Sequence, residues 1–459
     1  MDYISTRNTQ KTFLFKDVFL KGLAPDGGLF VPKKIPLYSL EDLNKIKNFT
    51  YREIAGKIIL DFCSDTFNED EINDLINLSY REFKVKEVVE IKKLGEKNLL
   101  ELFHGPTLAF KDIALQIIGN MYEKILEKNN LKLNIVVATS GDTGAAAISA
   151  IKNRKNMNIF VLHPYERVSE IQRKFMTTVD AKNVFNIALK GDFDDCQKFV
   201  KSMFVDKIFS KQINISGVNS INWARIIIQI VYYFYSYFKI TQNNEKINFS
   251  VPTGNFGDVY AGYVAKKMGL PIDKLIVATN KNDILNKVIS TGIYKPKKVE
   301  HTISPSMDIQ VASNFERLLF DIYSCNSDKI NLLMKFLKEK GEYKIDQEEQ
   351  NIIRNTFLSE SISDKETRLI ISEVYKNYKI LVDPHTAIAI GAMEKISAKG
   401  NNVALATAHP FKFSKVVTES TGKIPTVSKE LNNILNKKEK YDTLDCDLNR
   451  IKKYITERI

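Results

Sequence analysis

A lysine in an unusual setting offers the first chemistry in this sequence. Lys111 lies in "HGPTLAFKDIALQ", inside a mostly apolar run that follows a Gly-Pro-Thr turn. We expect Thr107 to cap a helix that places Lys111 in its first turns, on the same face as Ala114. Burial and the positive end of a helix both lower the pKa of an amine, and a neutral lysine amine is the nucleophile that forms a Schiff base. The alternative is a lysine that reaches solvent and pairs with Asp112.

A loop with two glycines, "VPTGNFGD", offers a site for an anion. It follows one expected strand and opens a helix, so its backbone N–H groups converge where a phosphate dianion binds well. Asp258 would repel a phosphate if its carboxylate faced inward, so we expect it to cap the helix instead. A plain glycine turn is the alternative, because Gly-x-x-Gly alone is a weak pattern. The candidate residues are Gly254, Asn255, Phe256, Gly257 and Asp258.

A third loop, "ATSGDTGAAA", also connects an expected strand to a helix and suits the carboxylate or phosphate of a substrate. It combines hydroxyl groups and backbone donors with small residues that allow close approach. The Gly-Lys-Ser/Thr ending of a nucleotide-binding loop is absent, and so is a dinucleotide fingerprint. Its polar residues are Ser140, Asp142 and Thr143. One activated lysine and two anion-binding loops together suggest pyridoxal phosphate and an anionic substrate.

Alternating strands and helices are expected to position these loops. Apolar runs such as "NIVVATS", "INFSVPTG", "KLIVATN" and "INISGVNS" each lead into a helical pattern, and "NVALATAHP" is a further strand. Continuous apolar strands followed by helices predict an α/β fold with parallel sheets covered on both faces. Such sheets bind ligands at the carboxyl ends of their strands. The strongly apolar stretch "IIIQIVYYFYSYF" is too short to span a bilayer and predicts a buried helix.

Composition excludes several classes of function. The net charge of +12 comes from lysines spread along 459 residues, which predicts a solvated surface and no nucleic-acid partner. The four cysteines form no Cys-x-x-Cys pair and the five histidines form no His-Glu-x-x-His motif, so we expect neither a metal site nor a disulfide framework. The N-terminus lacks an apolar signal core. We therefore expect a cytoplasmic protein without a membrane partner.

Ordered motifs along nearly the whole chain resemble one known family. They include "YISTRN", "GLAPDGGLFVP", "ELFHGPTLAFKD", "TSGDTGAAA", "RVSEIQRKFMTTV", "NIALKGDFDDCQ", "GVNSINWARIIIQIVYYF", "VPTGNFGDVYAGYVAKKMGLPI", "TISPSMDIQVASNFERLLF" and "TAHPFKF". The chain resembles the threonine synthases, specifically the long branch found in enterobacteria and fungi. The resemblance implies a fold-type II pyridoxal-phosphate enzyme, similar to the β subunit of tryptophan synthase, with an added N-terminal domain.

The resemblance also implies an activity and roles for particular residues. The activity is that of a carbon–oxygen lyase acting on phosphates (EC 4.2.3.1), which converts O-phospho-L-homoserine and water to L-threonine and phosphate. Lys111 would carry pyridoxal 5'-phosphate and serve as the base, and the 254–258 loop would hold the cofactor phosphate. Thr407 would offer its hydroxyl to the pyridine nitrogen. A strand-end threonine satisfied by the backbone is the alternative for Thr407.

The substrate site is implied less sharply. The leading anchors are Ser140, Asp142 and Thr143, and the further candidates are Asn219, Asn222, Arg225 and Lys412. Arg225 suits a phosphate through its bidentate geometry, but on an apolar helix it equally suits a buried ion pair. His104 and His409 flank the expected site, where a packed structural histidine is as common as a catalytic one. Two departures from the family pattern, Glu166 and Lys281, lie outside the cofactor motifs.

We expect three regions along the chain: an N-terminal threonine synthase domain over 1–90, a cofactor-binding catalytic region over 91–425 and a helical tail over 426–459. The catalytic region would hold two α/β subdomains and a charged helical insertion near 325–380. A monomer or weak homo-oligomer is expected. Three rival functions keep the fold: a phospho-lyase that releases phosphate and 2-oxobutanoate, a serine or threonine dehydratase, and a non-catalytic metabolite-binding relative.

Overall fold

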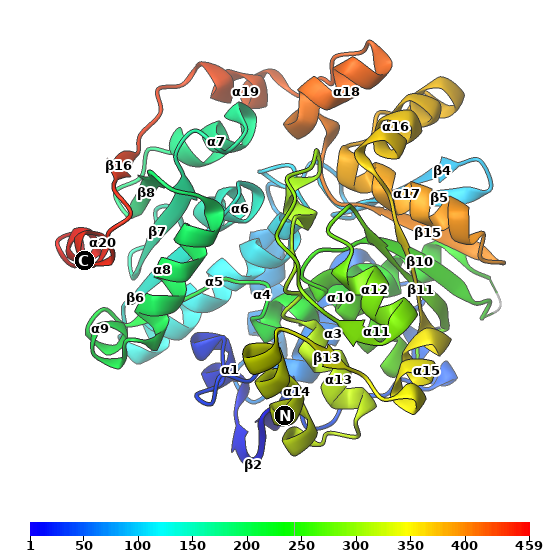
Figure 1. Ribbon diagram of the computed structural model, residues 1–459, viewed down its shortest axis with the longest axis horizontal. Coiled ribbons are helices and arrows are strands. Elements are labelled where there is room, and N and C mark those ends of the chain that lie inside the picture. Colours follow the sequence, from blue (N-terminus) through cyan, green and yellow to red (C-terminus); the bar gives the residue numbers. More distant parts are fainter. Residues whose placement is uncertain (243) are drawn as a thin grey trace.

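Two large sheets dominate the architecture (Figure 1). Across residues 1–242 and 244–459, which the computed structural model describes, the strands form sheets of six, five, three and two members. The three-stranded sheet is antiparallel and lies in the N-terminal block. Its strands and the helices that follow are β1 (Tyr3–Ser5), β2 (Asn8–Phe13), β3 (Phe30–Pro32), α1 (Phe15–Lys21), α2 (Leu40–Ile46), α3 (Tyr51–Cys63) and α4 (Glu69–Ser79).

The six-stranded sheet has the order β14-β11-β10-β15-β5-β4. Its strands run parallel except β4, which is antiparallel to β5. Consecutive residues point to opposite faces, so Val277 packs with α10 and α11, whereas Ile276 packs with α17. The elements are β4 (Glu90–Leu94), β5 (Lys97–Glu101), β10 (Ile247–Pro252), β11 (Ile272–Thr279), β14 (Phe357–Ser361), β15 (Asn401–Ala406), α10 (Trp223–Ile240), α11 (Gly257–Lys267) and α17 (Pro384–Ile396).

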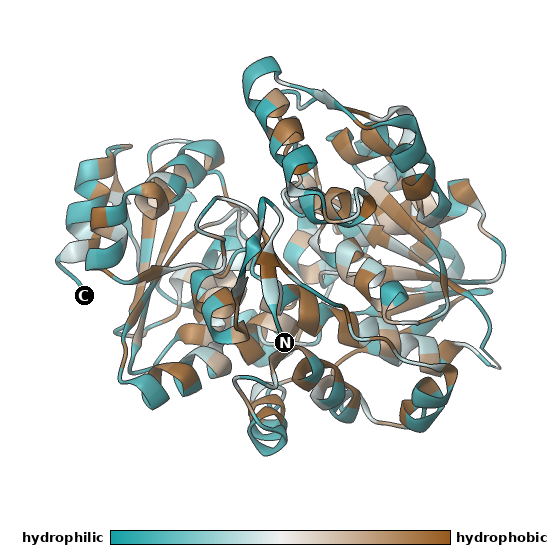
Figure 2. Cartoon of the chain, turned by 90° about the horizontal axis from the view of Figure 1, so that it is seen from below, coloured by the Kyte–Doolittle hydropathy of each residue, from teal (hydrophilic) through white to brown (hydrophobic). Residues whose placement is uncertain are grey.

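The five-stranded sheet is parallel throughout, in the order β16-β8-β7-β6-β9. One face packs with α5 and α6 in the core shared with the larger sheet, and the other packs with α8, α9 and α20. Figure 2 shows apolar strands between helices whose outward faces are hydrophilic. The elements are β6 (Leu133–Ala138), β7 (Met157–Pro164), β8 (Val184–Leu189), β9 (Ile215–Ser216), β16 (Asp442–Leu444), α5 (Lys111–Asn129), α6 (Asp142–Ile151), α7 (Glu170–Thr177), α8 (Phe193–Val205), α9 (Lys207–Gln212) and α20 (Leu448–Thr456).

The expected α/β fold with helix-covered parallel sheets is confirmed, and so is the buried helix α10. Its side chains are buried from Trp223 to Tyr237. None of the helices in the described part of the chain has the length and apolar character needed to cross a membrane.

Two segments carry strands that the sequence pattern did not predict. The charged stretch near 325–380 contributes β14, the edge strand of the larger sheet, and the C-terminal tail contributes β16 to the smaller one. The remaining elements are α12 (Ile284–Thr291), β12 (Ile293–Tyr294), η1 (Pro305–Met307), α13 (Phe315–Ile322), α14 (Ser327–Lys340), β13 (Tyr343–Lys344), α15 (Gln347–Thr356), α16 (Asp364–Tyr378), η2 (Pro410–Phe413), α18 (Ser414–Thr421), α19 (Lys429–Asn432) and η3 (Asn433–Asn436).

Candidate active site

The segment before Lys111 is held by the two residues that follow β15 rather than by a helix cap. Ala109 and Ala408 form an isolated antiparallel bridge, and the Phe110 N–H donates to the Thr407 carbonyl at 2.9 Å. Helix α5 then begins at Lys111 itself. The prediction that Thr107 caps this helix is wrong: its N–H and hydroxyl donate to the carboxylate of Asp112 at 2.8 and 2.6 Å. The lysine is therefore fixed directly at the carboxyl edge of the larger sheet.

The Lys111 amine is buried and faces Asp142. Its Nζ lies 3.5 Å from Oδ2 of Asp142 and 5.0 Å from the centroid of the Phe110 ring, and the lysine side chain is 11% exposed. The alternative of a solvent-reaching lysine paired with Asp112 is wrong, because Asp112 is engaged by Thr107. Burial lowers the pKa of Lys111; Asp142 opposes this, and the charges of Lys412 and Arg225 lower it further. An amine with a depressed pKa gives up its proton near neutrality more readily than an ordinary lysine.

Asp142 lies between Lys111 and Lys412 and contacts the amines of both. Its Oδ1 lies 2.7 Å from Lys412 Nζ and accepts a hydrogen bond from Gln172 at 3.0 Å, while Oδ2 accepts one from the Ser306 hydroxyl at 3.3 Å. Burial alone would raise the pKa of Asp142, but the charges of Lys412 and Lys111 and the hydrogen bonds from Gln172 and Lys412 hold it well below the ordinary value. The Lys412 amine also donates to the Thr107 carbonyl at 2.9 Å. This carboxylate therefore stays ionised and orients both amines.

The loop before α6 carries two hydroxyl groups, those of Ser140 and Thr143, that are free to bind a ligand at the N-terminus of the helix. The Thr139 hydroxyl accepts from the N–H groups of Gly141 and Gly144 at 3.0 and 2.9 Å, which folds the loop over the end of β6. Gly141 has a φ of 139°, and a side chain there would meet Gln172 at 2.9 Å. Ser140 and Thr143 are half-buried, and among the described residues their hydroxyls have no protein partner. Open donors at a helix N-terminus form an anion site.

The 254–257 turn has the shape and the donors to hold a phosphate. Phe256 adopts φ 63°, and α11 begins at Gly257 without a side-chain cap. In the described part of the chain, the N–H groups of residues 254–257 donate to no protein acceptor. A Cβ on Gly254 would lie 2.9 Å from the Ser306 carbonyl oxygen, so only glycine leaves this surface clear. These features fit the phosphate of pyridoxal phosphate.

Asp258 does not cap helix α11, contrary to the expectation from its sequence position. Its Oδ1 accepts hydrogen bonds from the hydroxyls of Tyr232 and Tyr233 at 2.5 and 2.9 Å, on the buried side of the helix. Burial raises the pKa of Asp258 to about 6, against the lowering effect of both tyrosines and of Arg225. The carboxylate is thus turned toward α10 by partners that a local sequence pattern cannot reveal.

We expect Asp258→Asn to change how stability depends on pH. The folded-state pKa of Asp258 is raised to about 6, so its contribution to stability is fully present below the unfolded value and lost as pH rises through about 6. The free energy of unfolding of the wild type should therefore fall by about 3 kcal/mol relative to that of the variant between about pH 4 and about pH 7. Denaturant unfolding of both proteins across this range measures it. Asp328→Asn, an exposed aspartate on α14, should leave the pH profile unchanged, and parallel curves for Asp258→Asn would contradict the assignment.

Arg225 is buried near Lys111 without an acidic partner. Its Nη1 donates to the Val218 carbonyl at 3.3 Å, Nε has no partner, and no carboxylate in the described part of the chain lies within ion-pair distance. Burial lowers the pKa of Arg225 to about 10. A buried cation with an unused donor suits an anionic ligand better than the ion pair that was the alternative.

The side chains of Asn219, Asn222 and Thr407 differ in how many hydrogen bonds they make within the protein. Asn222 caps α10 through Oδ1 and donates to the Phe19 carbonyl at 3.0 Å, so the fold uses both ends of its side chain. Asn219 is half-buried at the turn before it. Thr407 is 6% exposed, and among the described residues its hydroxyl has no hydrogen-bond partner, unlike the backbone-satisfied alternative. Its carbonyl fixes Phe110, which places Thr407 beside Lys111.

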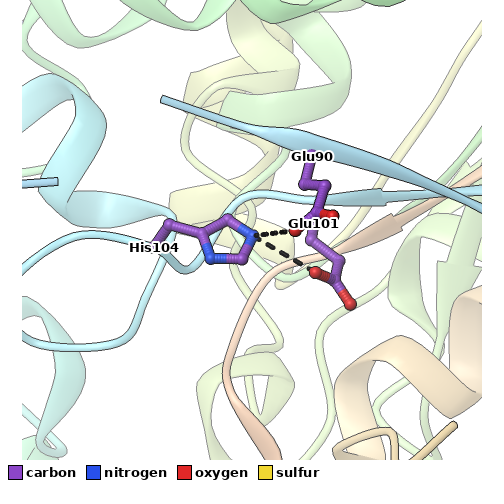
Figure 3. Close-up of side chains that lie close together, drawn as sticks. All are labelled: Glu90, Glu101 and His104. Carbon is purple, nitrogen blue, oxygen red and sulfur yellow. Dashed lines mark ion pairs between the residues drawn. The ribbon is translucent and has the colours of Figure 1, made fainter. Parts of the chain in front are cut away.

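His104 and His409 are engaged in structural contacts. Figure 3 shows His104 directed at Glu101 and Glu90, with Nε2 at 3.2 and 3.9 Å from their oxygens. The three ligand atoms lie within 4.8 Å of one another, a spacing that a cation site would share. However, Glu101 already has an ion pair with Lys92 at 3.0 Å besides its contact with His104. Burial lowers the pKa of His409 to about 4, and its Nδ1 accepts from the Phe411 N–H at 3.2 Å.

Several residues at the site had no role in the sequence-based prediction. Ser306 and Gln172 contact Asp142, and His385 contacts Ser306. Ser306 and Gln172 lie in "TISPSMD" and "RVSEIQRK", two of the motifs that carry the family resemblance, and this was their only signal. Glu166, one of the two departures, has φ 57°, a conformation that glycine adopts more easily, and both it and Lys281 are exposed.

Family descriptions match most of the chain. "Threonine synthase N terminus" matches residues 2–80, "Pyridoxal-phosphate dependent enzyme" matches 91–333 and "Threonine synthase, C-terminal" matches 386–455. The threonine synthase of Pseudomonas aeruginosa is 41% identical, with 100% of this chain and 98% of the relative covered. The enzyme of Saccharomyces cerevisiae is 40% identical, with 100% and 96% covered.

Solved structures agree over the same length. The structure of pyridoxal-phosphate-bound threonine synthase from Brucella melitensis has a TM-score of 0.96 and 40% identity, and it covers 100% of this chain and 99% of that one. Threonine synthase from yeast has a TM-score of 0.93 and 38% identity, with 100% and 98% covered. With a full-length match in sequence, in structure and in the cofactor-type fold, the chain belongs to the threonine synthase family.

Proposed function

We propose that this chain converts O-phospho-L-homoserine and water to L-threonine and phosphate with pyridoxal phosphate as cofactor. Family membership makes it a pyridoxal-phosphate enzyme of threonine biosynthesis. The observation that carries the proposal is the buried Lys111 amine with its depressed pKa, which lies beside Asp142 at the carboxyl ends of the strands. The open phosphate-shaped turn at Gly254 supports it.

Three elements would hold the cofactor. Lys111 Nζ would bond to its aldehyde carbon, the N–H groups of residues 254–257 would bind its phosphate, and the Thr407 hydroxyl would face its ring nitrogen. When bound, the cofactor withdraws the electron pair left behind when a C–H bond next to the substrate nitrogen breaks. A hydroxyl at the ring nitrogen would be a neutral partner, and the hydrogen bond from the Phe110 N–H to the Thr407 carbonyl anchors the backbone that would carry it.

Lys111 would carry the protons of the reaction. Its neutral amine would take the proton from Cα of the substrate, and it would move protons at Cβ and Cγ as phosphate leaves Cγ and water adds to Cβ. Asp142 contacts both lysines, and its own negative charge would repel an anionic substrate group. We therefore assign Asp142 to orienting Lys111 and Lys412 rather than to binding the substrate.

The anionic groups of the substrate would use the open donors around this centre. Ser140 and Thr143 offer hydroxyls at the N-terminus of α6, and Arg225 offers an unused guanidinium donor. Lys412 adds positive charge, and Asn219 is a further candidate. Asn222 contributes by fixing the start of α10, which carries Arg225.

The proposal extends to assembly and location. We place the enzyme in the cytoplasm, as a monomer or weak homo-oligomer that acts on a small molecule without nucleic-acid or membrane partners. The four free cysteines among the described residues support the location, because a reducing compartment keeps thiols unpaired.

Product stoichiometry tests the proposed function. Purified holoenzyme with O-phospho-L-homoserine should release phosphate and threonine in equal amounts, because one water replaces one phosphate. Phosphate by colorimetry and threonine by chromatography measure the two products in the same reaction. Phosphate with 2-oxobutanoate would instead mean the phospho-lyase, and no product would point to a binding protein.

A further inference from the structure

We infer that His385 is a positioning residue of the active site. It holds the segment 304–308 across the phosphate turn and against Asp142 by accepting a hydrogen bond from the Ser306 N–H. The contact joins the start of α17 to a segment 79 positions earlier in the chain. The inference rests on the proposed function for its kinetic consequences, whereas the contact itself belongs to the fold.

The ring of His385 is locked in one orientation by Asp383. Its Nδ1 lies 2.6 Å from Asp383 Oδ2, and both residues are buried, with 3% and 0% exposure. Asp383 also caps α17 by accepting from the N–H groups of His385 and Thr386. Because Asp383 accepts at Nδ1, the ring carries its proton there and Nε2 is an acceptor. Nε2 accordingly meets the Ser306 N–H at 3.2 Å.

Ser306 touches both halves of the site. Its hydroxyl donates to Asp142 Oδ2 at 3.3 Å, on the side that faces Lys111. Its carbonyl oxygen lies 2.9 Å from where a Cβ of Gly254 would be, and Met307 Cα lies 3.2 Å from the same point. A small movement of this segment would therefore change the carboxylate that orients Lys111 and the wall of the phosphate turn together.

The ends of the segment are fixed independently of its middle. Asn280 donates to Ser304 Oγ at 2.9 Å and to Asp308 Oδ1 at 2.8 Å. Pro305 has no N–H, and the N–H groups of Met307 and Asp308 donate back into the segment, to Ser304 and Pro305. The Ser306 N–H is the donor that reaches out to α17, so His385 holds the backbone in the middle of the segment while the Ser306 hydroxyl contacts Asp142.

The same histidine packs against Phe413, the residue that follows the second lysine of the site. Its ring contacts that of Phe413 edge-on, with centroids 4.9 Å apart, and Phe413 follows Lys412 in η2. Loss of the Nε2 acceptor would leave the half-buried Ser306 N–H without its protein partner. We expect the segment to shift, and misplacement of a site by about 1 Å costs on the order of 100-fold in rate.

Two substitutions of His385 distinguish the roles of its two ring nitrogens, Nδ1 and Nε2. In His385→Gln the side-chain oxygen reaches the position of Nε2 and can accept from Ser306, whereas in His385→Asn the amide reaches only the position of Nδ1 and Asp383. We expect His385→Asn to lower kcat/KM by about 10- to 100-fold and His385→Gln to stay within about threefold of wild type. His301→Gln, an exposed histidine close to the same segment, is the matched control and should match wild type.

Hydrogen exchange of the holoenzymes gives a readout that is independent of turnover. The amide of Ser306 should exchange faster in His385→Asn than in wild type and His385→Gln, while peptides from α10 keep their protection. Equal exchange and equal kcat/KM in all three would overturn the inference, and equal impairment of both variants would reduce His385 to a packing role. A wild type that makes no threonine would overturn the proposed function, yet the exchange pattern would still decide the role of His385.

Discussion

Lys111→Ala should abolish threonine formation while the protein remains folded. The variant removes both the amine that would bond to the cofactor and the base that would move the protons. General base catalysis alone contributes about 10² to 10⁴ in rate, so we expect a loss of at least about 10³ when the covalent role is lost as well. Phosphate release and threonine formation, measured together under saturating cofactor and substrate, report both halves of the reaction.

The fold should tolerate this substitution for an electrostatic reason. The pKa of Lys111 is depressed chiefly by burial, which means that its charged form costs free energy in the folded state. Alanine removes that cost, and Asp142 keeps its ion pair with Lys412 at 2.7 Å. Thermal unfolding checks this point. Lys128→Ala, an exposed lysine on the same helix, should keep full activity, and retained turnover in Lys111→Ala would exclude the assigned role.

The strands of this fold could be predicted where they are buried on both faces. Runs such as "NIVVATS" and "INFSVPTG" are mostly apolar without a polar alternation, because helices cover both sides of the sheets, and they form β6 and β10. Strand β16 carries no such signal, since Asp442 and Thr443 are exposed and the strand exists only through its pairing with β8. Edge strands of this kind are set by long-range pairing and not by local composition.

In the candidate site, too, local sequence patterns predict some residues, whereas others are placed by contacts between segments far apart in the chain. Lys111 and the Gly254 turn stand out locally, because a charge in an apolar run and glycines after a strand each need a physical reason. The partners of Asp142 do not stand out, since Gln172, Ser306 and Lys412 come from three separate segments. The expected helix cap at Asp258 followed from keeping its carboxylate away from a phosphate, but the fold instead gives this carboxylate two tyrosine donors on α10.

Lys412→Met should destabilise the protein strongly and also reduce turnover. Removal of one partner of a buried ion pair costs about 3 to 5 kcal/mol, because the remaining charge loses its compensation. Lys111 still faces Asp142 at 3.5 Å, so we expect the lower end of this range. Without the charge of Lys412 the pKa of Lys111 rises, and a smaller fraction of the amine is neutral. Denaturant unfolding and kcat measure the two effects.

A double substitution separates the ion pair from simple packing. Lys412→Met combined with Asp142→Asn removes both charges and should recover part of the stability lost in Lys412→Met. The pKa of Asp142 is held below its unfolded value, so its contribution is present above about pH 4 and lost as the pH falls further. The acid-induced loss of stability should therefore be smaller in Asp142→Asn than in wild type. If the double variant is no more stable than Lys412→Met, the buried charges are not coupled, and the orienting role assigned to Asp142 loses its electrostatic basis.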